Sequence, residues 1–238
     1  MNDIGQAFLT AFKLIAGWDR DLAEIIGLSL QVSLIALAVA AAIGLPLGAA
    51  VALLRFPGRR ALAVLLSALM GLPPVVVGLI VYLMLSRAGP LGVLGLLFTP
   101  TAMIIAQCLL ITPIIAALTR QIVLDLWSDY REQLTSLGCG PARAIPTLLW
   151  DARTALVTVI LAGFGRATAE VGAVMIVGGN IDHVTRVMTT AIALETSRGD
   201  LTLALALGVV LMALSLTING AAFLCRDWAD RGQGRLAS

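Results

Sequence analysis

Long apolar runs dominate this chain, and five of them are long enough to cross a membrane as helices. A bilayer core of about 30 Å requires roughly 20 consecutive apolar residues in helical conformation. Helices are expected because lipid offers the backbone no other hydrogen-bond partners. The runs also lack the polar–apolar alternation of barrel strands. The expected spans are residues 25–54, 61–85, 101–124, 154–178 and 201–225.

A long polar stretch, residues 125–153, interrupts this apolar pattern between the third and fourth spans. It contains acidic, basic and helix-forming residues, with glycines at its centre. Pro141 follows Gly140 and can begin a helix, because proline is tolerated at the first helical position. The stretch therefore predicts a helix, a glycine turn and a second helix in water. A solvated loop with a helical tendency is the alternative to a docking element for a soluble partner.

Three further segments lie outside the spans. Residues 1–24 place apolar side chains among polar ones, which is typical of an amphipathic helix lying in the membrane interface. The loop 179–200 predicts a short amphipathic helix, with Asp182 as its N-cap and Gly199 as its stop. Residues 226–238 form a polar tail. Residues 25–225, including the stretch 125–153, are thus expected to form one transmembrane domain.

Composition excludes an ordinary soluble domain. Hydrophobic residues make up 59% of the chain and charged residues 13%, with a mean hydropathy of +0.98. Soluble proteins are about half apolar and about a quarter charged. If the turn 55–60 is cytoplasmic, ten basic residues fall inside and five outside. The positive-inside rule then places the N-terminus outside and the C-terminus in the cytoplasm.

Several kinds of catalytic and metal site are missing from the sequence. Lys13 is the only lysine and lies in no GxxxxGK[ST] motif, so the chain has no P-loop. His183 is the only histidine, and HExxH and GxSxG motifs are absent. The three cysteines have no metal-ligand spacing. We therefore expect no enzyme activity, metal or cofactor in this chain, and any energy source must be an ion gradient or another subunit.

Two features inside the spans stand out. Pro73 and Pro74 interrupt the second span, and Arg166 and Glu170 are charged residues in the fourth. Residues four apart share one helix face and can pair. Ionisable residues in a bilayer are costly and are functional candidates by default. We interpret these four residues as part of a translocation path or gate. Arg166–Glu170 is either a buried strut between helices or, less favoured, a direct anion contact.

The centre of the polar stretch resembles the EAA loop of permease subunits of bacterial ABC importers. The resemblance is carried by Glu132 and, six residues later, Gly138, shortly before the fourth span. Gln133 and Leu134 replace the family's two alanines, and the usual Ile-x-Leu-Pro ending is replaced as well. In that family the loop docks on the ATP-hydrolysing subunit. The resemblance implies that coupling involves Glu132, Leu137, Gly138 and Arg143.

A second resemblance narrows the family. The run GFGRATAEVGAVMIVGGNI, residues 163–181, resembles molybdate/tungstate-type permeases, most of all the tungstate members. The sequences at 55–58 and 72–75 match the same group, and the resemblance covers roughly residues 28–224. It implies an all-α, type I ABC importer permease in the bacterial inner membrane. It also implies a second copy of the chain, two ATP-binding subunits that hold ATP and Mg, and an extracytoplasmic substrate-binding protein.

Four polar residues at the expected outer mouth are candidates for contact with such a binding protein. They are Asn180, Asp182, His183 and Arg186. A lone loop histidine is more often simply solvated, which is the alternative for this group.

The sequence thus predicts the membrane subunit of an ATP-driven importer for tungstate, with molybdate next. We expect no nucleic-acid partner. An ion-coupled secondary transporter or channel that works without an ATPase is the alternative.

Overall fold

The described part of the chain consists of helices joined by turns and loops. This computed structural model describes residues 20–234 and the isolated residues 5, 9, 10, 12 and 17, and no strand occurs in that part of the chain. The interfacial segment predicted for 1–24 lies mostly outside the described residues. The elements are α2 (Arg20–Leu53), α3 (Arg59–Leu69), α4 (Pro74–Leu85), η1 (Gly92–Leu94), α5 (Pro100–Ser136), α6 (Pro141–Asp151), α7 (Arg153–Thr168), α8 (Gly172–Gly178), α9 (Met188–Arg198) and α10 (Leu201–Gly234).

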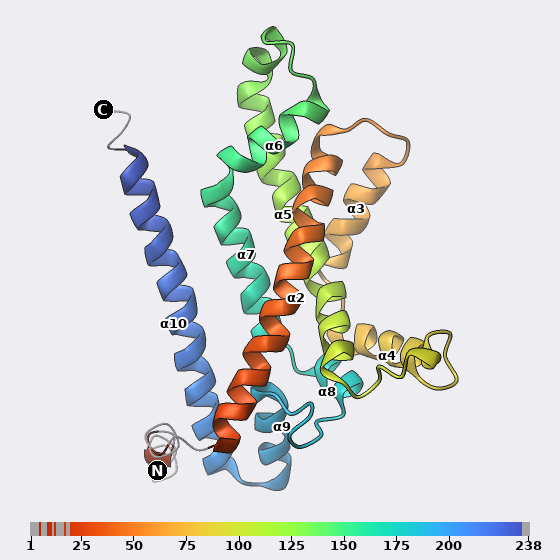
Figure 1. Cartoon of the computed structure of the whole chain (residues 1–238), viewed down its shortest axis with the longest axis vertical. Helices are drawn as coiled ribbons and strands as arrows, with labels where there is room; N and C mark the ends of the chain where they lie inside the picture. Colours follow the sequence, from red (N-terminus) through yellow and green to blue (C-terminus); the bar gives the residue numbers. More distant parts are fainter. Residues whose placement is uncertain (1–4, 6–8, 11, 13–16, 18–19, 235–238) are drawn as a thin grey trace. The chain divides into compact units, whose positions relative to one another are not determined.

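Three helices, α2, α5 and α10, are long and apolar enough to cross a membrane (Figure 1). Two further pairs pass the same test together: α3 with α4, bent by 106°, and α6 with α7, bent by 76°. Up to five spans are therefore present, which confirms the predicted helical membrane fold. The orientation of the termini stays a prediction.

The second span is broken at the two prolines. Helix α3 ends at Leu69, and α4 begins at Pro74, with Pro73 extended at φ −64° and ψ 120°. A residue that precedes a proline is pushed away from helical conformation, so Leu72 and Pro73 together stop the helix. Pro74 then occupies the first turn of α4, where its missing N–H costs nothing.

The fourth span is also broken, which the apolar pattern did not predict. The uninterrupted helix expected over 154–178 divides into α7 and α8, with residues 169–171 between them. Val171 is the N-cap of α8, and the carboxylate of Glu170 just before it accepts the backbone N–H of Ala173, which helps the new helix to start. A side chain that satisfies an orphan amide in this way favours a helix start.

The chain forms two compact units, and α2, α5, α7 and α10 contribute to both. Unit 1 comprises residues 1–36, 73–107 and 165–220, and unit 2 comprises residues 37–72, 108–164 and 221–238. In unit 1, Leu22 of α2, Met188 of α9 and Leu207 of α10 lie in one core cluster. The paired half-helices α4 and α8 also pack together in this unit.

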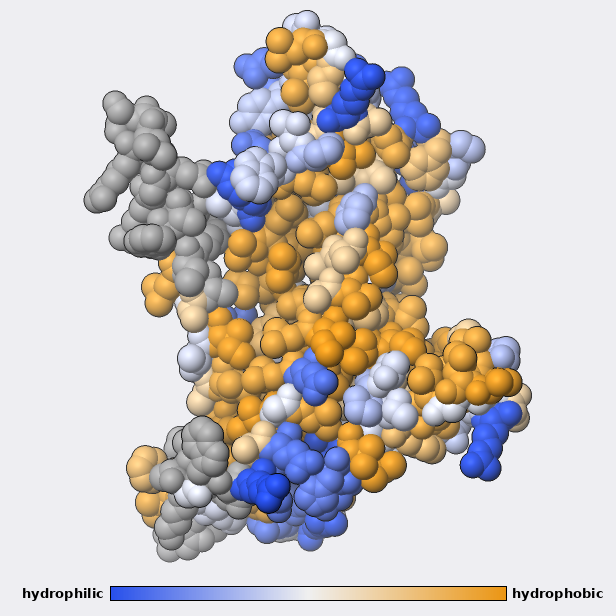
Figure 2. All heavy atoms as spheres, viewed as in Figure 1, coloured by the Kyte–Doolittle hydropathy of each residue, from blue (hydrophilic) through white to orange (hydrophobic). Residues whose placement is uncertain are grey.

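Unit 2 is built on close packing between α2 and α5. A Cβ added at Gly48 of α2 would lie 2.4 Å from the carbonyl oxygen of Ala116 in α5, so only glycine allows this approach. Val51, Ala63 and Leu66 join Ala116 in one buried cluster. The hydrophilic side chains visible in this unit gather over the end of α5 and over α6, and apolar side chains cover the helices next to them (Figure 2).

Candidate functional site

A buried carboxylate lies in the break between α7 and α8. Glu170 is 5% exposed. Its Oε1 accepts the N–H of Ala173 at 3.0 Å, and its backbone oxygen accepts the hydroxyl of Thr189 at 2.9 Å. Glu170 therefore joins three elements of unit 1: it follows α7, helps α8 to start and anchors α9.

Arg166 is the charged partner of this carboxylate. Its Nη2 lies 3.6 Å from Oε2 of Glu170, and its side chain is 34% exposed. Arg166 lies in the last turn of α7, where the helix dipole favours a cation. The predicted pair is therefore present. Its geometry differs from expectation because Glu170 lies beyond the end of α7 rather than on the same helix face.

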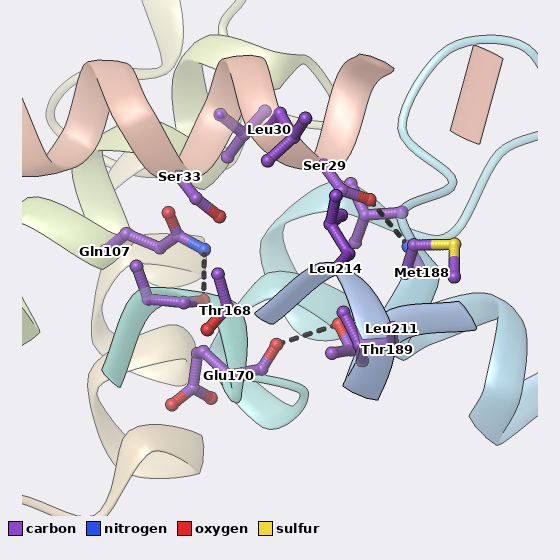
Figure 3. A pocket seen from close by; sticks show the side chains of 13 residues that line it. Ser29, Leu30, Ser33, Gln107, Thr168, Glu170, Met188, Thr189, Leu211 and Leu214 are labelled. Carbon is purple, nitrogen blue, oxygen red and sulfur yellow. Dashed lines mark hydrogen bonds between the residues drawn. The ribbon is translucent and has the colours of Figure 1, made fainter. Parts of the chain in front are cut away.

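A small cavity lined by apolar side chains, several uncharged polar ones and Glu170 adjoins the break. Its volume is about 20 Å³, enough for about one water molecule. Gln107 of α5 donates from Nε2 to the carbonyl oxygen of Ala167 at 3.2 Å, and Figure 3 shows Ser33, Thr168 and Glu170 around it. The Oε1 of Gln107 is buried without a hydrogen-bond partner in the described structure. A water molecule in this cavity would supply one.

Sequence reasoning missed Gln107 and the hydroxyl groups around it. A primary amide within the apolar run 101–124 was the available signal, because an unpaired amide in lipid costs several kcal/mol, roughly 4–8 on a cyclohexane scale. The same polar seam continues at Ser29, whose Oγ accepts the N–H of Met188 at 2.8 Å. No spacing rule connects residues 159 positions apart.

The two interrupted spans meet at glycine contacts in unit 1. A Cβ at Gly78 of α4 would lie 2.7 Å from the Cα of Ala173 in α8. A Cβ at Gly172 would lie 2.7 Å from Cγ2 of Val75, the residue after Pro74. The structure therefore brings the proline break beside the Glu170 break. Non-helical backbone at membrane depth is tolerated only where protein or a watery cavity surrounds it, and paired broken helices are typical of transporter sites.

The polar stretch forms an elbow in unit 2. Helix α5 runs unbroken from the third span to Ser136, so the first arm is an extension of a membrane helix rather than a separate one. Gly138 makes the turn at φ +73°, a conformation that other L residues rarely adopt. Helix α6 then begins at Pro141, as predicted, and Ala144 and Leu148 bury its inner face.

The four predicted coupling residues lie on the outside of this elbow. Glu132, Leu137, Gly138 and Arg143 are all exposed. Leu137 is 82% exposed, although Leu134, one turn earlier, packs against the unit 2 core. An exposed leucine at the tip of a polar elbow is a suitable contact for a protein surface, because burying it there removes apolar area from water.

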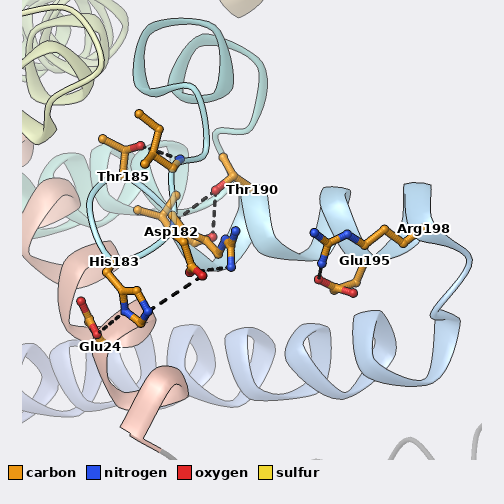
Figure 4. Close-up of polar contacts among 10 residues, drawn as sticks. Glu24, Asp182, His183, Thr185, Thr190, Glu195 and Arg198 are labelled. Carbon is orange, nitrogen blue, oxygen red and sulfur yellow. Dashed lines mark hydrogen bonds and ion pairs between the residues drawn. The ribbon is translucent and has the colours of Figure 1, made fainter.

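The loop before α9 carries the predicted outer-mouth residues. Nδ1 of His183 lies 3.0 Å from Oε2 of Glu24, and Arg186 pairs with Asp182 at 2.6 Å (Figure 4). The hydrogen bond to Glu24 and the charge of Asp182 raise the pKa of His183. Asn180 has φ +50° and a buried, unpartnered Oδ1.

Helix α9 begins later than predicted. Val187 is its N-cap, because Thr190 Oγ1 accepts the N–H of Val187 at 3.0 Å, whereas Asp182 is engaged by Arg186. The prediction of Asp182 as the N-cap was therefore wrong. Gly199, at φ +83°, ends the helix as predicted.

Known proteins match this chain over most of its length. The family model described as "Binding-protein-dependent transport system inner membrane component" matches residues 44–231. The tungstate uptake system permease protein TupB of Peptoclostridium acidaminophilum is 42% identical over 227 residues, 95% of this chain and 100% of the relative. A probable anion ABC transporter permease protein of Haloferax volcanii is 42% identical over 221 residues, 90% and 95% of the two chains. TupB of Campylobacter jejuni is 38% identical over 164 residues, 69% of each chain.

Proposed function

Because the chain belongs to the family of binding-protein-dependent transport system inner membrane components, we propose that it is the permease subunit of an ABC importer that carries tungstate. It is a multi-pass inner-membrane protein and a transport subunit rather than an enzyme. One observation carries the choice of tungstate: 42% identity, over 95% of the chain, to a tungstate uptake permease. Molybdate is the next candidate, because it is a tetrahedral dianion of the same kind.

In this proposal the working complex contains a second copy of the chain, two ATP-binding subunits and an extracytoplasmic substrate-binding protein. ATP and Mg²⁺ belong to the ATP-binding subunits. Exposed apolar side chains of α4, at Val75, Leu79 and Leu83, support a protein or lipid neighbour there. We assign that face to the second copy, which would place the pathway between two equivalent surfaces.

The α5–α6 elbow transmits the movement of the ATP-binding subunits. Support comes from its rigidity, since α5 continues into the membrane without a break and α6 packs on the unit 2 core. Exposed Leu137 and the Gly138 turn provide the contact surface. Glu132 and Arg143 flank that surface and provide charges of opposite sign that align the elbow on the ATP-binding subunit. Movement of the elbow thus becomes movement of α5 itself.

The paired breaks form the architecture of the gate. Glu170 helps α8 to start and is nearly buried, so its carboxylate is already engaged by a backbone amide and by Arg166. These contacts favour the strut interpretation over direct binding of the anion. Arg166 and Glu170 are therefore positioning residues that fix α8 relative to α7 and α9, in the unit that contains Pro73 and Pro74. The outer-mouth residues Asn180, Asp182, His183 and Arg186 receive the binding protein.

Tungstate uptake into proteoliposomes tests this proposal. The permease is reconstituted with its ATP-binding subunits and binding protein, and accumulated tungsten is measured with ATP or with a non-hydrolysable analogue. We expect uptake only with hydrolysable ATP, and competition by molybdate stronger than by sulfate. Equal uptake by the permease alone, driven by an ion gradient, would instead establish the secondary transporter.

A further inference from the structure

Four arginines converge on one open groove of unit 2, outside the candidate gate. Arg55, Arg59 and Arg60 come from the turn between α2 and α3, and Arg120 comes from α5. The described lining of this groove contains no acidic residue. Nor does any of the four guanidinium groups form an ion pair within the described part of the chain. The groove therefore concentrates positive charge without internal compensation.

Packing holds this groove in shape. Ala63, which lines the groove, belongs to the buried cluster of α2, α3 and α5 side chains that also contains Val51 and Leu66. Gly48 brings α2 so close to α5 that an added Cβ would lie 3.0 Å from the backbone nitrogen of Arg120. Arg120 is thus anchored against α2, close to the turn that carries the other three arginines. This helix contact fixes where Arg120 stands relative to the turn, whereas Arg55 and Arg60 reach the groove as exposed side chains.

One of the four arginines has a structural task. Nε of Arg59 donates to the carbonyl oxygen of Val51 at 2.8 Å, and Nη2 donates to the carbonyl oxygen of Ala52. These bonds satisfy carbonyls at the end of α2, which otherwise lack helical partners. Arg59 therefore fixes the turn, and Arg55, Arg60 and Arg120 remain for a ligand. The Nε of Arg120 is buried and has no hydrogen-bond partner in the described structure.

The start of α3 adds to the positive field. Gly58, at φ +84°, precedes the helix and supplies no side-chain cap, and no acidic residue lies in the first turn. Helix N-termini carry partial positive charge and favour anions, and cations there are unfavourable. Arg59 is offset there by the carbonyl oxygens at the end of α2, so Arg60 is the unfavourably placed cation of this first turn. A bound anion would convert the unfavourable arrangement into a favourable one.

We propose that this groove binds a tetrahedral oxyanion, supplied either by the phosphate of an anionic phospholipid or by a free ion. Guanidinium forks match tetrahedral oxyanions in two-bond geometry. Phe56 and Val64 also line the groove, and Val64 is 69% exposed. This apolar wall can accept an acyl chain beside the headgroup, whereas a free ion would use the arginines alone. The site is distinct from the Glu170 break and does not depend on the transported substrate.

Two binding measurements on the assembled transporter distinguish the sources. Native mass spectrometry counts phosphatidylglycerol and phosphatidylcholine retained after graded delipidation. Equilibrium dialysis with radiolabelled inorganic phosphate measures free-ion binding. The groove variant combines Arg60→Gln and Arg120→Gln. The control variant combines Arg87→Gln and Arg131→Gln, which removes the same charge from exposed arginines outside the groove. If gel filtration shows that the Arg120 substitution prevents folding, the single variants Arg60→Gln and Arg55→Gln, both at exposed positions, replace the double variant.

We expect at least about tenfold weaker binding in the groove variant than in the control, because each lost charge-assisted hydrogen bond is worth a factor of about ten or more. Loss of phosphatidylglycerol identifies the lipid, and loss of phosphate binding identifies the free ion. Arg60→Lys with Arg120→Lys should bind at an intermediate level, since it keeps charge but not the fork. Wild-type binding by this lysine variant would indicate bulk charge alone and overturn the proposal. Equal binding by the groove and control variants would also overturn it.

Discussion

Glu170 offers the sharpest test of the strut interpretation, through a comparison of Glu170→Gln with Glu170→Ala. Glutamine keeps an oxygen that can accept the N–H of Ala173 and loses only the charge that faces Arg166. Alanine removes both the acceptor and the partner of Arg166. The side chain is 4% exposed, so solvent does not replace what alanine removes.

The expected magnitudes follow from these contacts. Loss of the carboxylate leaves the buried N–H of Ala173 without an acceptor, which costs about 1–3 kcal/mol. Glu170→Ala should therefore destabilise unit 1 by about 1–3 kcal/mol. Glu170→Gln should cost about 1 kcal/mol or less, because the 3.6 Å pair with Arg166 is long and the arginine is 34% exposed.

Thermal unfolding of the purified transporter, followed by tryptophan fluorescence, measures this difference, and ATP-driven uptake is measured on the same samples. We expect Tm to fall clearly for alanine and slightly for glutamine, with uptake following Tm. The reasoning is refuted if glutamine retains full stability and abolishes uptake. That result would mean that the negative charge itself acts in transport.

Three further predictions concern the elbow, the helix contact and the outer loop. Gly138→Asp should leave the protein inserted and uncouple ATP hydrolysis from uptake. Gly138→Asn, which has the same shape as the aspartate variant without its charge, should uncouple less. If both variants hydrolyse the same amount of ATP per tungsten transported, the added charge at the elbow plays no part in coupling. Gly78→Ala should push α4 from α8 and cost about 1–3 kcal/mol, measured by thermal unfolding. The control Gly208→Ala, where a Cβ meets nothing within 4 Å, should be neutral or stabilising. Similar losses of stability in both variants would contradict the packing argument. The contact between His183 and Glu24 raises the pKa of the histidine above its unfolded value of 6.5. The stabilisation that this contact gives the folded protein is therefore complete below pH 6.5 and is lost as pH rises through the folded pKa. The Tm difference between wild type and His183→Gln should therefore be largest at acidic pH and shrink as pH rises, and a pH-independent difference would exclude the ionised pair.

The polar elbow was the part of the site that the sequence described best. Polar residues, a glycine and a proline mark a turn and a helix start within a few residues, so neighbours along the chain suffice to predict both. Pro141 does begin a helix, and Gly138 does adopt a left-handed conformation. The continuity of α5 into the elbow was missed, because apolar and polar segments look separate in the sequence although one helix can carry both.

The outer loop shows the opposite case. Asp182 had the composition of an N-cap and lies near the right place, but Arg186 engages it, and Thr190 performs the capping instead. The partner of His183 is Glu24, from a helix at the other end of the chain. Local propensity could not decide between these arrangements, since each depends on which segments fold next to the loop.

The sequence by itself determined that this protein is a helical membrane protein with a polar elbow, and its resemblance to ABC importer permeases indicated a transport subunit. Hydropathy and backbone hydrogen bonding in lipid leave few other possibilities, and these constraints act along the chain. Only the tertiary structure decided that the fourth span breaks at Glu170 and that this break lies against the Pro73–Pro74 break. It also decided that Arg120 joins the arginines of a distant turn. These features depend on close approaches at Gly78, Gly172 and Gly48, where two segments far apart in sequence fit together because the glycine carries no side chain.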